Sequence, residues 1–331
     1  MNTGQRIACI ALLISPTVWA APLAQVGPFE FHSDFWQNLH HFLYEQAAAP
    51  PHQRKPSPDD LTASEKIAWD KALAYYRRSL TPHDLLFDPH MQSIDTELAE
   101  DEGLPKLVVN GKDGALWDTL NSVAPIYRAH WWTTHDQTNR AFAASAVPLV
   151  EHYGALLMKQ LTTIYDTPWP KNPIRVDFAE YANWAGGYTY TYGFGRIHVI
   201  MSSADPANQG NAALEMLFHE ATHGMVPSDS GRLASQIAAA AKASGVQTPK
   251  DLVHIFIFYT AGELTRRDLA AAGINYLPYA DAKHLYQDDW ARWHSGIEVY
   301  WKQHIDGALS LNDAVAKIVG SGGGARRSGG R

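Results

Sequence analysis

The pattern of apolar and polar residues divides the chain into three regions. Residues 25–165 carry apolar side chains mainly at helical spacing, as in the segment 31–46, where Phe and Leu form one stripe. Residues 172–203 instead contain short runs of β-branched and aromatic residues separated by glycines, which is typical of strands. Residues 205–319 return to helical spacing. We therefore predict a mainly helical α+β protein in which a small antiparallel sheet precedes further helices.

Individual elements follow from the same pattern. Besides the helix over residues 31–46, helices are predicted over residues 64–80, beginning after Thr62, and over residues 116–130. Glycines at 193 and 195 indicate a hairpin between the last two strands, so an antiparallel meander is expected. Its strands are predicted over residues 174–181, 187–192 and 196–202.

The first twenty residues differ from the rest of the chain. Arg6 precedes an apolar run over residues 7–15, and small residues follow up to Ala20, which predicts a secretory signal peptide cleaved after that residue. We therefore expect a periplasmic or extracellular protein. Cys9, the only cysteine, lies in this segment, so the mature chain would have no thiol. Nothing later approaches 18 unbroken apolar residues, and no membrane span is expected.

Charge and composition narrow the class of protein. Removal of the signal peptide leaves 26 basic against 34 acidic side chains, which argues against nucleic acid as a partner. The apolar fraction of 46% is ample for a core. We expect an N-terminal, mainly helical region over residues 21–170 and a second region, a sheet with helices, over residues 171–320. A disordered tail over residues 321–331 would follow, because that segment has almost no apolar residue.

The segment 217–223, LFHEATH, contains the pattern H-E-x-x-H. Good helix formers precede it and Gly224 follows it, so the motif is predicted to lie on a helix. His219 and His223 would then share one helix face and direct two imidazole nitrogens at one cation. Glu220 would stand beside the metal as a base for metal-bound water. The alternative is a pair of histidines that form ordinary hydrogen bonds, with Glu220 on the surface.

A catalytic zinc site normally needs a third protein ligand. Asp229, ten residues after His219, has the metzincin spacing for this ligand. That arrangement also needs a glycine where Val226 stands, and a methionine turn, yet Met225 is the last methionine of the chain. Asp229 is therefore the weaker candidate.

The stronger candidate is Glu263, which lies on a helix predicted over residues 249–272. Its surroundings, residues 255–264, are otherwise apolar, and an unpaired carboxylate would be costly to bury there. A metal would satisfy this carboxylate. The alternative is an ion pair with Arg266 or Arg267.

Other residues of the same helix could contribute to the site. Phe256, Tyr259 and Glu263 form one stripe, and Gly262 would allow close approach of the two helices. Tyr259 could donate a hydrogen bond to the developing oxyanion, or serve as a core aromatic residue. His254 is an alternative donor, although it lies nine residues before Glu263 and hence on the opposite side of an ideal helix.

These motifs resemble those of the gluzincins, zinc metallopeptidases in which H-E-x-x-H on one helix is joined by a glutamate from a later helix. The resemblance covers about residues 174–273. It implies a Zn²⁺ cofactor, and a sheet whose edge strand binds an extended peptide, a position held here by residues 196–202. Many gluzincins have an aspartate four residues after the glutamate ligand, where this chain has Arg267. The implied metal ligands are His219, His223 and Glu263, with Glu220 as base.

We therefore expect a secreted zinc metallopeptidase that acts on peptide or protein substrates. Glu215, Asp268 or a backbone carbonyl would orient His219. Two other functions stay open from the sequence: hydrolysis of a non-peptide amide, for instance in cell-wall material, and a secreted binding protein that a metal stabilises. Alternating tyrosines would form either a substrate wall or ordinary packing. These are Tyr188, Tyr190 and Tyr192.

Overall fold

The computed structural model describes residues 21–50, 52, 58, 60–193 and 195–322, so the expected signal peptide and most of the expected disordered tail lie outside the described residues. The strands are β1 (Ala24–Val26), β2 (Phe29–His32), β3 (Ile174–Ala179), β4 (Gly187–Tyr192) and β5 (Arg196–Ser202). The longer helices are α1 (Phe35–Ala48), α2 (Ala63–Ser79), α3 (Pro89–Glu100), α4 (Gly114–Tyr127), α5 (Thr133–Tyr165), α6 (Asn211–Met225), α7 (Gly231–Ser244), α8 (Leu252–Ala271) and α12 (Leu311–Gly322). The short helices are α9 (Tyr279–Ala282), α10 (Ala291–Gly296) and α11 (Lys302–Ile305).

The strands form one mixed sheet in the order β1-β2-β3-β5-β4. The predicted hairpin is confirmed, because β4 and β5 pair antiparallel with Tyr188 opposite Ile200. The prediction of an antiparallel meander is wrong for the rest of the sheet, since β2, β3 and β5 are parallel. β5 lies between β3 and β4. β3 and β5 are buried almost throughout, as expected for strands that are covered on both faces of the sheet.

Two strands come from the region that was expected to be helical. β1 and β2 form a short hairpin, and β2 then pairs with β3, which lies more than 140 residues later in the chain. The helix expected from residue 31 therefore starts only at Phe35, where the Asp34 side chain accepts a hydrogen bond from the Gln37 N–H and caps it. Four residues are too few for alternation to reveal β2 in the sequence.

The predicted boundaries of the other helices are closer to the structure. α2 begins after Thr62, whose side chain and that of Glu65 form a reciprocal capping box. α8 starts at Leu252, three residues after the expected position. A local cap thus determines where α2 begins, whereas α8 begins without a side-chain cap hydrogen bond.

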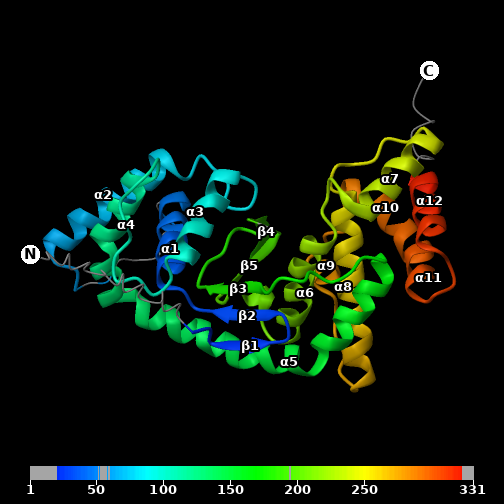
Figure 1. Cartoon of the computed structure of the whole chain (residues 1–331), viewed down its shortest axis with the longest axis horizontal. Helices are drawn as coiled ribbons and strands as arrows, with labels where there is room; N and C mark the ends of the chain where they lie inside the picture. Colours follow the sequence, from blue (N-terminus) through cyan, green and yellow to red (C-terminus); the bar gives the residue numbers. More distant parts are fainter. Residues whose placement is uncertain (1–20, 51, 53–57, 59, 194, 323–331) are drawn as a thin grey trace, which may run out of the picture.

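Helices cover both faces of the sheet. Side chains such as Val176 and Val199 point into the main core with α5 and α6, whereas Asp177 and His198 point to the opposite face, next to α1 and α3. α5 runs the length of the sheet and joins the two ends of the molecule (Figure 1). One end holds α1 to α4 with a core of their own, and the other holds α7, α8 and α10 to α12.

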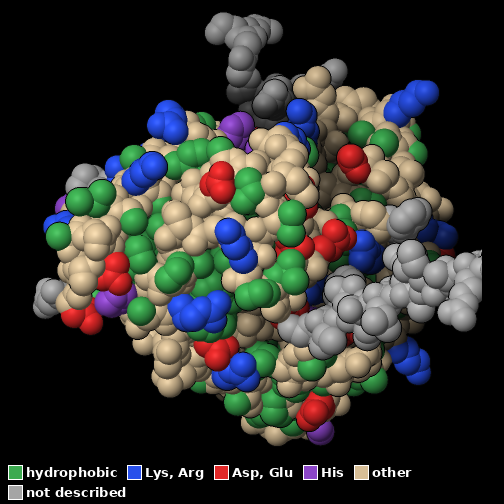
Figure 2. Space-filling view, turned by 60° about the vertical axis from the view of Figure 1, so that its left-hand side comes forward, with side chains coloured by type: hydrophobic (Ala, Val, Ile, Leu, Met, Phe, Trp, Pro, Cys, Tyr) green, Lys and Arg blue, Asp and Glu red, His purple; other side chains and the backbone are tan. Residues whose placement is uncertain are grey.

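α4 and α5 form a continuous helical run, Gly114–Tyr165, joined by a π-helical turn at Arg128–Trp132. By length and composition alone this run could cross a membrane, with a mean hydropathy of 1.3 over 18 residues. The core helix of a globular protein meets the same criterion, and α5 contributes Val150, Leu157 and Leu161 to the main core. On the face seen in Figure 2, basic and acidic side chains are interspersed.

Candidate metal centre

α6 carries the H-E-x-x-H motif and packs against the sheet and α8. Its close contact with the sheet depends on Gly224, since a Cβ there would meet Cγ1 of Ile197 on β5 at 2.7 Å. His219 and Glu220 are buried on this helix, and His223 is partly buried at its last turn. The prediction that the motif lies on a helix is therefore confirmed.

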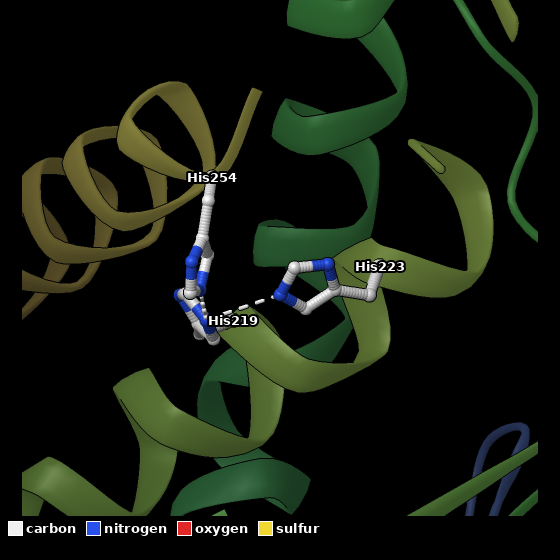
Figure 3. Close-up of side chains that lie close together, drawn as sticks. All are labelled: His219, His223 and His254. Atoms are coloured by element: carbon white, nitrogen blue, oxygen red, sulfur yellow. Dashed lines mark hydrogen bonds between the residues drawn. The ribbon is translucent and has the colours of Figure 1, made fainter. Parts of the chain in front are cut away.

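A third histidine meets the two of the motif (Figure 3). His254, in the first turn of α8, places its Nε2 atom 3.0 Å from Nε2 of His219, and Nε2 of His223 lies 3.3 Å from the same atom. One ligand atom from each residue falls within 4.8 Å of the other two. Two nitrogens that bind zinc at 2.0–2.1 Å with tetrahedral angles are about 3.3–3.4 Å apart. The two distances from His219 are close to this value, so the three imidazoles form a group that could hold one metal ion.

The protonation of these rings also suits a cation. Burial lowers the pKa of His219 well below its ordinary value, and lowers the pKa of His223 to about 3 and that of His254 to about 4. The rings are consequently neutral near pH 7. A neutral imidazole offers one lone pair and one N–H, so Nε2 of His219 cannot satisfy both neighbours, whereas a cation would accept a lone pair from each ring.

Glu220 points to the edge strand. The hydroxyl of Thr189 on β4 lies 2.8 Å from Oε2 of Glu220 and 3.0 Å from its backbone oxygen. Burial raises the pKa of Glu220 to about 7, and the Thr189 hydrogen bond acts in the opposite direction. A carboxyl with such a pKa can both accept and release a proton near neutral pH.

Glu263 does not join the histidines. Its carboxylate pairs with Arg266 at 2.8 and 2.9 Å and with Arg267 at 2.7 Å, all on α8. The alternative of an ion pair is thus the arrangement that the structure contains. Nine residues separate His254 from Glu263, which is two and a half turns, so a helix that directs His254 at α6 must direct Glu263 away from it. Asp229, the other proposed ligand, is exposed and lies outside the cluster.

Tyr259, the predicted oxyanion donor, lies on the Glu263 side of α8. Burial and then the carboxylates of Glu263 and Glu298 raise its pKa, and its ring contacts His294 at 6.1 Å. The predicted stripe of Phe256, Tyr259 and Glu263 therefore does not face the motif. Phe256 instead packs in the main core.

The stripe of α8 that does face α6 consists of His254, Phe258 and Gly262, each four residues from the next. The Phe258 ring lies 3.9 Å from the His219 ring and 4.6 Å from the His254 ring. Gly262 allows the close helix approach that the sequence predicted, because a Cβ there would meet Oε1 of Glu215 on α6 at 3.1 Å. This four-residue spacing was the signal in the sequence that could have identified His254.

Tyr279 stands next to this stripe. Its ring stacks on that of Phe258, with centroids 6.1 Å apart and planes 6° from parallel. Burial, followed by the carboxylates of Asp205, Glu220 and Glu215, raises the pKa of Tyr279. Its hydroxyl is therefore within electrostatic range of Glu220, and nothing in the sequence pattern had singled it out.

The groups expected to orient His219 have other partners. Both oxygens of Glu215 accept hydrogen bonds from the segment around Tyr279, and Asp268 accepts one from Gln160. Nδ1 of His219 is buried without a hydrogen-bond partner among the described residues. The Trp290 ring lies beside the His254 ring, with centroids 5.8 Å apart, and its Nε1–H donates a hydrogen bond to Asp251, which precedes α8.

Tyr188 and Tyr190 of β4 lie on the face of the sheet opposite to Thr189, which bonds Glu220, and so point away from His219, His223 and His254. The Tyr188 hydroxyl donates to Asp95 at 2.5 Å, and the Tyr190 hydroxyl lies 2.6 Å from Nδ1 of His198. Both side chains are buried against the helices of the N-terminal end. Tyr188 and Tyr190 are therefore ordinary packing residues and do not form a substrate wall.

No protein-family model, curated protein or solved structure matches this chain. The candidate metal site is therefore supported only by the positions of His219, His223 and His254 themselves.

Proposed function

We propose that the protein is a zinc-dependent hydrolase of peptide bonds, with His219, His223 and His254 as the metal ligands. The observation that supports this most is the convergence of three imidazoles, one buried and two partly buried, whose ligand atoms lie within 4.8 Å of one another. Three protein ligands leave one coordination position open, which is the arrangement of catalytic rather than structural zinc sites.

A zinc ion held by His219, His223 and His254 would supply a Lewis acid that acidifies water and polarises the scissile carbonyl. Glu220 accepts the proton of the attacking water and passes it to the leaving amine. Thr189 holds the carboxylate in position through its hydroxyl. Tyr279 replaces Tyr259 as the proposed donor to the developing oxyanion.

A peptide substrate is supported by the location of β4. This strand lies at the edge of the sheet and pairs only with β5 among the described strands. Its residue Thr189 bonds Glu220, so an extended chain that added to the free edge would run beside the base. The sequence had placed β5 in this role, but β5 lies inside the sheet.

The test is cleavage of a diverse peptide library by the purified protein. Chelator-sensitive cleavage is expected, and Glu220→Gln should abolish it while zinc stays bound, because that residue is not a ligand. Cleavage confined to non-peptide amides would support an amide hydrolase instead. Stoichiometric zinc with no turnover on either substrate class would contradict catalysis and support a metal-stabilised binding protein.

A further inference from the structure

A carboxylate lies buried one helical turn before the first histidine of the motif. Glu215 on α6 is 0% exposed, and its two oxygens accept the N–H of Tyr279 at 3.1 and 3.0 Å. Oε2 also accepts the hydroxyl of Tyr276 at 2.7 Å. Glu215 therefore binds a segment that follows α8 by only a few residues and fixes it to the metal-binding helix.

The fit around this carboxylate is close. At Gly262 of α8, a Cβ would meet Oε1 of Glu215 at 3.1 Å and Cβ of Pro278 at 2.8 Å. α6, α8 and the segment 276–279 thus converge on Glu215. Burial of a carboxylate is costly, and apolar residues of similar volume would often fill such a junction as well or better. The cost of burying Glu215 points to a role of this carboxylate beyond packing.

The contacts continue from Glu215 back to the metal site. Tyr279, held by its backbone N–H, stacks on Phe258, and Phe258 lies against the ring of His219. The Tyr279 side chain is partly exposed, and its hydroxyl has no hydrogen-bond partner among the described residues. A substrate group could therefore reach this hydroxyl.

We propose that Glu215 is a positioning residue that holds Tyr279 at the metal site, so that the Tyr279 hydroxyl faces bound substrate. This role rests on the proposed function. The carboxylate is suited to it because two acceptor oxygens can receive a backbone N–H and a side-chain hydroxyl together, which fixes the segment 276–279 both in distance and in orientation.

A double-mutant cycle tests the proposal. Tyr279→Phe and Glu215→Gln should each lower kcat by about tenfold or more on a cleaved peptide, with little change in KM. If Glu215 acts through Tyr279, the double variant should be about as slow as the slower single variant, because the second change removes nothing further. Effects that multiply, or full activity of Glu215→Gln, would overturn the proposal.

A second measurement does not depend on catalysis. In Glu215→Gln, hydrogen exchange of the peptide containing residues 276–282 should accelerate by about tenfold or more, while the peptide containing α6 stays protected. Unchanged exchange at residues 276–282 would overturn the proposal even if no substrate is known. Absence of peptidase activity in the wild-type protein, with accelerated exchange in the variant, would refute the proposed function and leave the tether intact.

Asp268→Asn is the matched control. It makes the same chemical change at a partly buried carboxylate on α8, whose partner is Gln160. We expect kcat, zinc content and exchange at residues 276–282 to stay within twofold of wild type, a bound set by the ordinary scatter of surface substitutions. A loss equal to that of Glu215→Gln would show that any removed carboxylate has this effect and would overturn the specific role.

Discussion

His254 and Glu263 lie on opposite faces of α8, and only His254 faces the motif on α6. The Nε2 atoms of His254 and His219 are 3.0 Å apart, whereas both oxygens of Glu263 are bonded by arginines of α8 itself. The candidate metal site thus consists of His219, His223 and His254. The sequence predicted a third ligand, Glu263, on this helix, whereas the residue of α8 that lies beside the two histidines of the motif is His254, on the opposite side of the helix.

Replacement of the third histidine should abolish tight zinc binding. We expect His254→Ala to weaken zinc binding by about 100-fold or more, since even residues that only support metal ligands contribute 10–100-fold. Zinc should raise the stability of the wild-type protein by about 2.7 kcal/mol at 100 times its Kd, and at the same zinc concentration the gain in the variant should fall to about 0.4 kcal/mol or less. Titration calorimetry and thermal unfolding with and without zinc measure both effects.

Glu263→Gln provides the control for that experiment. It should keep one zinc per chain and lose about 1 kcal/mol of stability, because its arginine partners are partly exposed. Loss of zinc from Glu263→Gln, together with retention by His254→Ala, would reverse the assignment of the third ligand.

Thr189 should control the base without affecting the metal. Thr189→Val removes the hydroxyl that bonds Glu220, and we expect kcat to fall by about tenfold at neutral pH. The lost hydrogen bond had favoured the ionised carboxylate, so the pKa of Glu220 should rise and the acidic limb of the pH–rate profile should move to higher pH. Thr189→Ser keeps the hydroxyl and should retain the wild-type profile. An unshifted limb in the valine variant would contradict this role.

Gly224 should be intolerant of any side chain. Gly224→Ala would place a Cβ against Cδ1 and Cγ1 of Ile197, which is 2% exposed and has little room to move. We expect a loss of about 1–3 kcal/mol in the free energy of unfolding, measured by urea denaturation. Ile197→Val, which removes Cδ1, should recover part of this loss in the double variant. Strictly additive losses would show that the two residues do not compete for space.

Glu215 should make stability depend on pH. Burial raises its pKa to about 7 from an ordinary value of 4.5, so the folded protein binds this proton more tightly than the unfolded chain. Its contribution is fully present below pH 4.5 and is lost as pH rises through 7, by about 1.4 kcal/mol for each unit of pKa difference. Urea denaturation of metal-free protein from pH 5 to 8 should therefore show Glu215→Gln gaining stability relative to wild type. A constant difference across this range would contradict the shift.

Several features of the fold could be predicted from the sequence because they depend on neighbouring residues. Thr62 and Glu65 cap α2 from within four positions, and the two histidines of the motif share a helix face by periodicity alone. The β4–β5 hairpin likewise followed from the glycines between its strands. Each of these signals lies within five consecutive residues of the sequence.

Contacts between distant segments decided the rest. Helical periodicity defined two faces of α8, one with His254 and one with Glu263, but not which face would pack on α6. The face with His254 packs on α6, and Gly262 lies at this contact, where a Cβ would meet Glu215 and Pro278. The sheet was mixed for a similar reason: β2 reaches β3 across more than 140 residues, and a period of two residues carries no information about which strand becomes the neighbour.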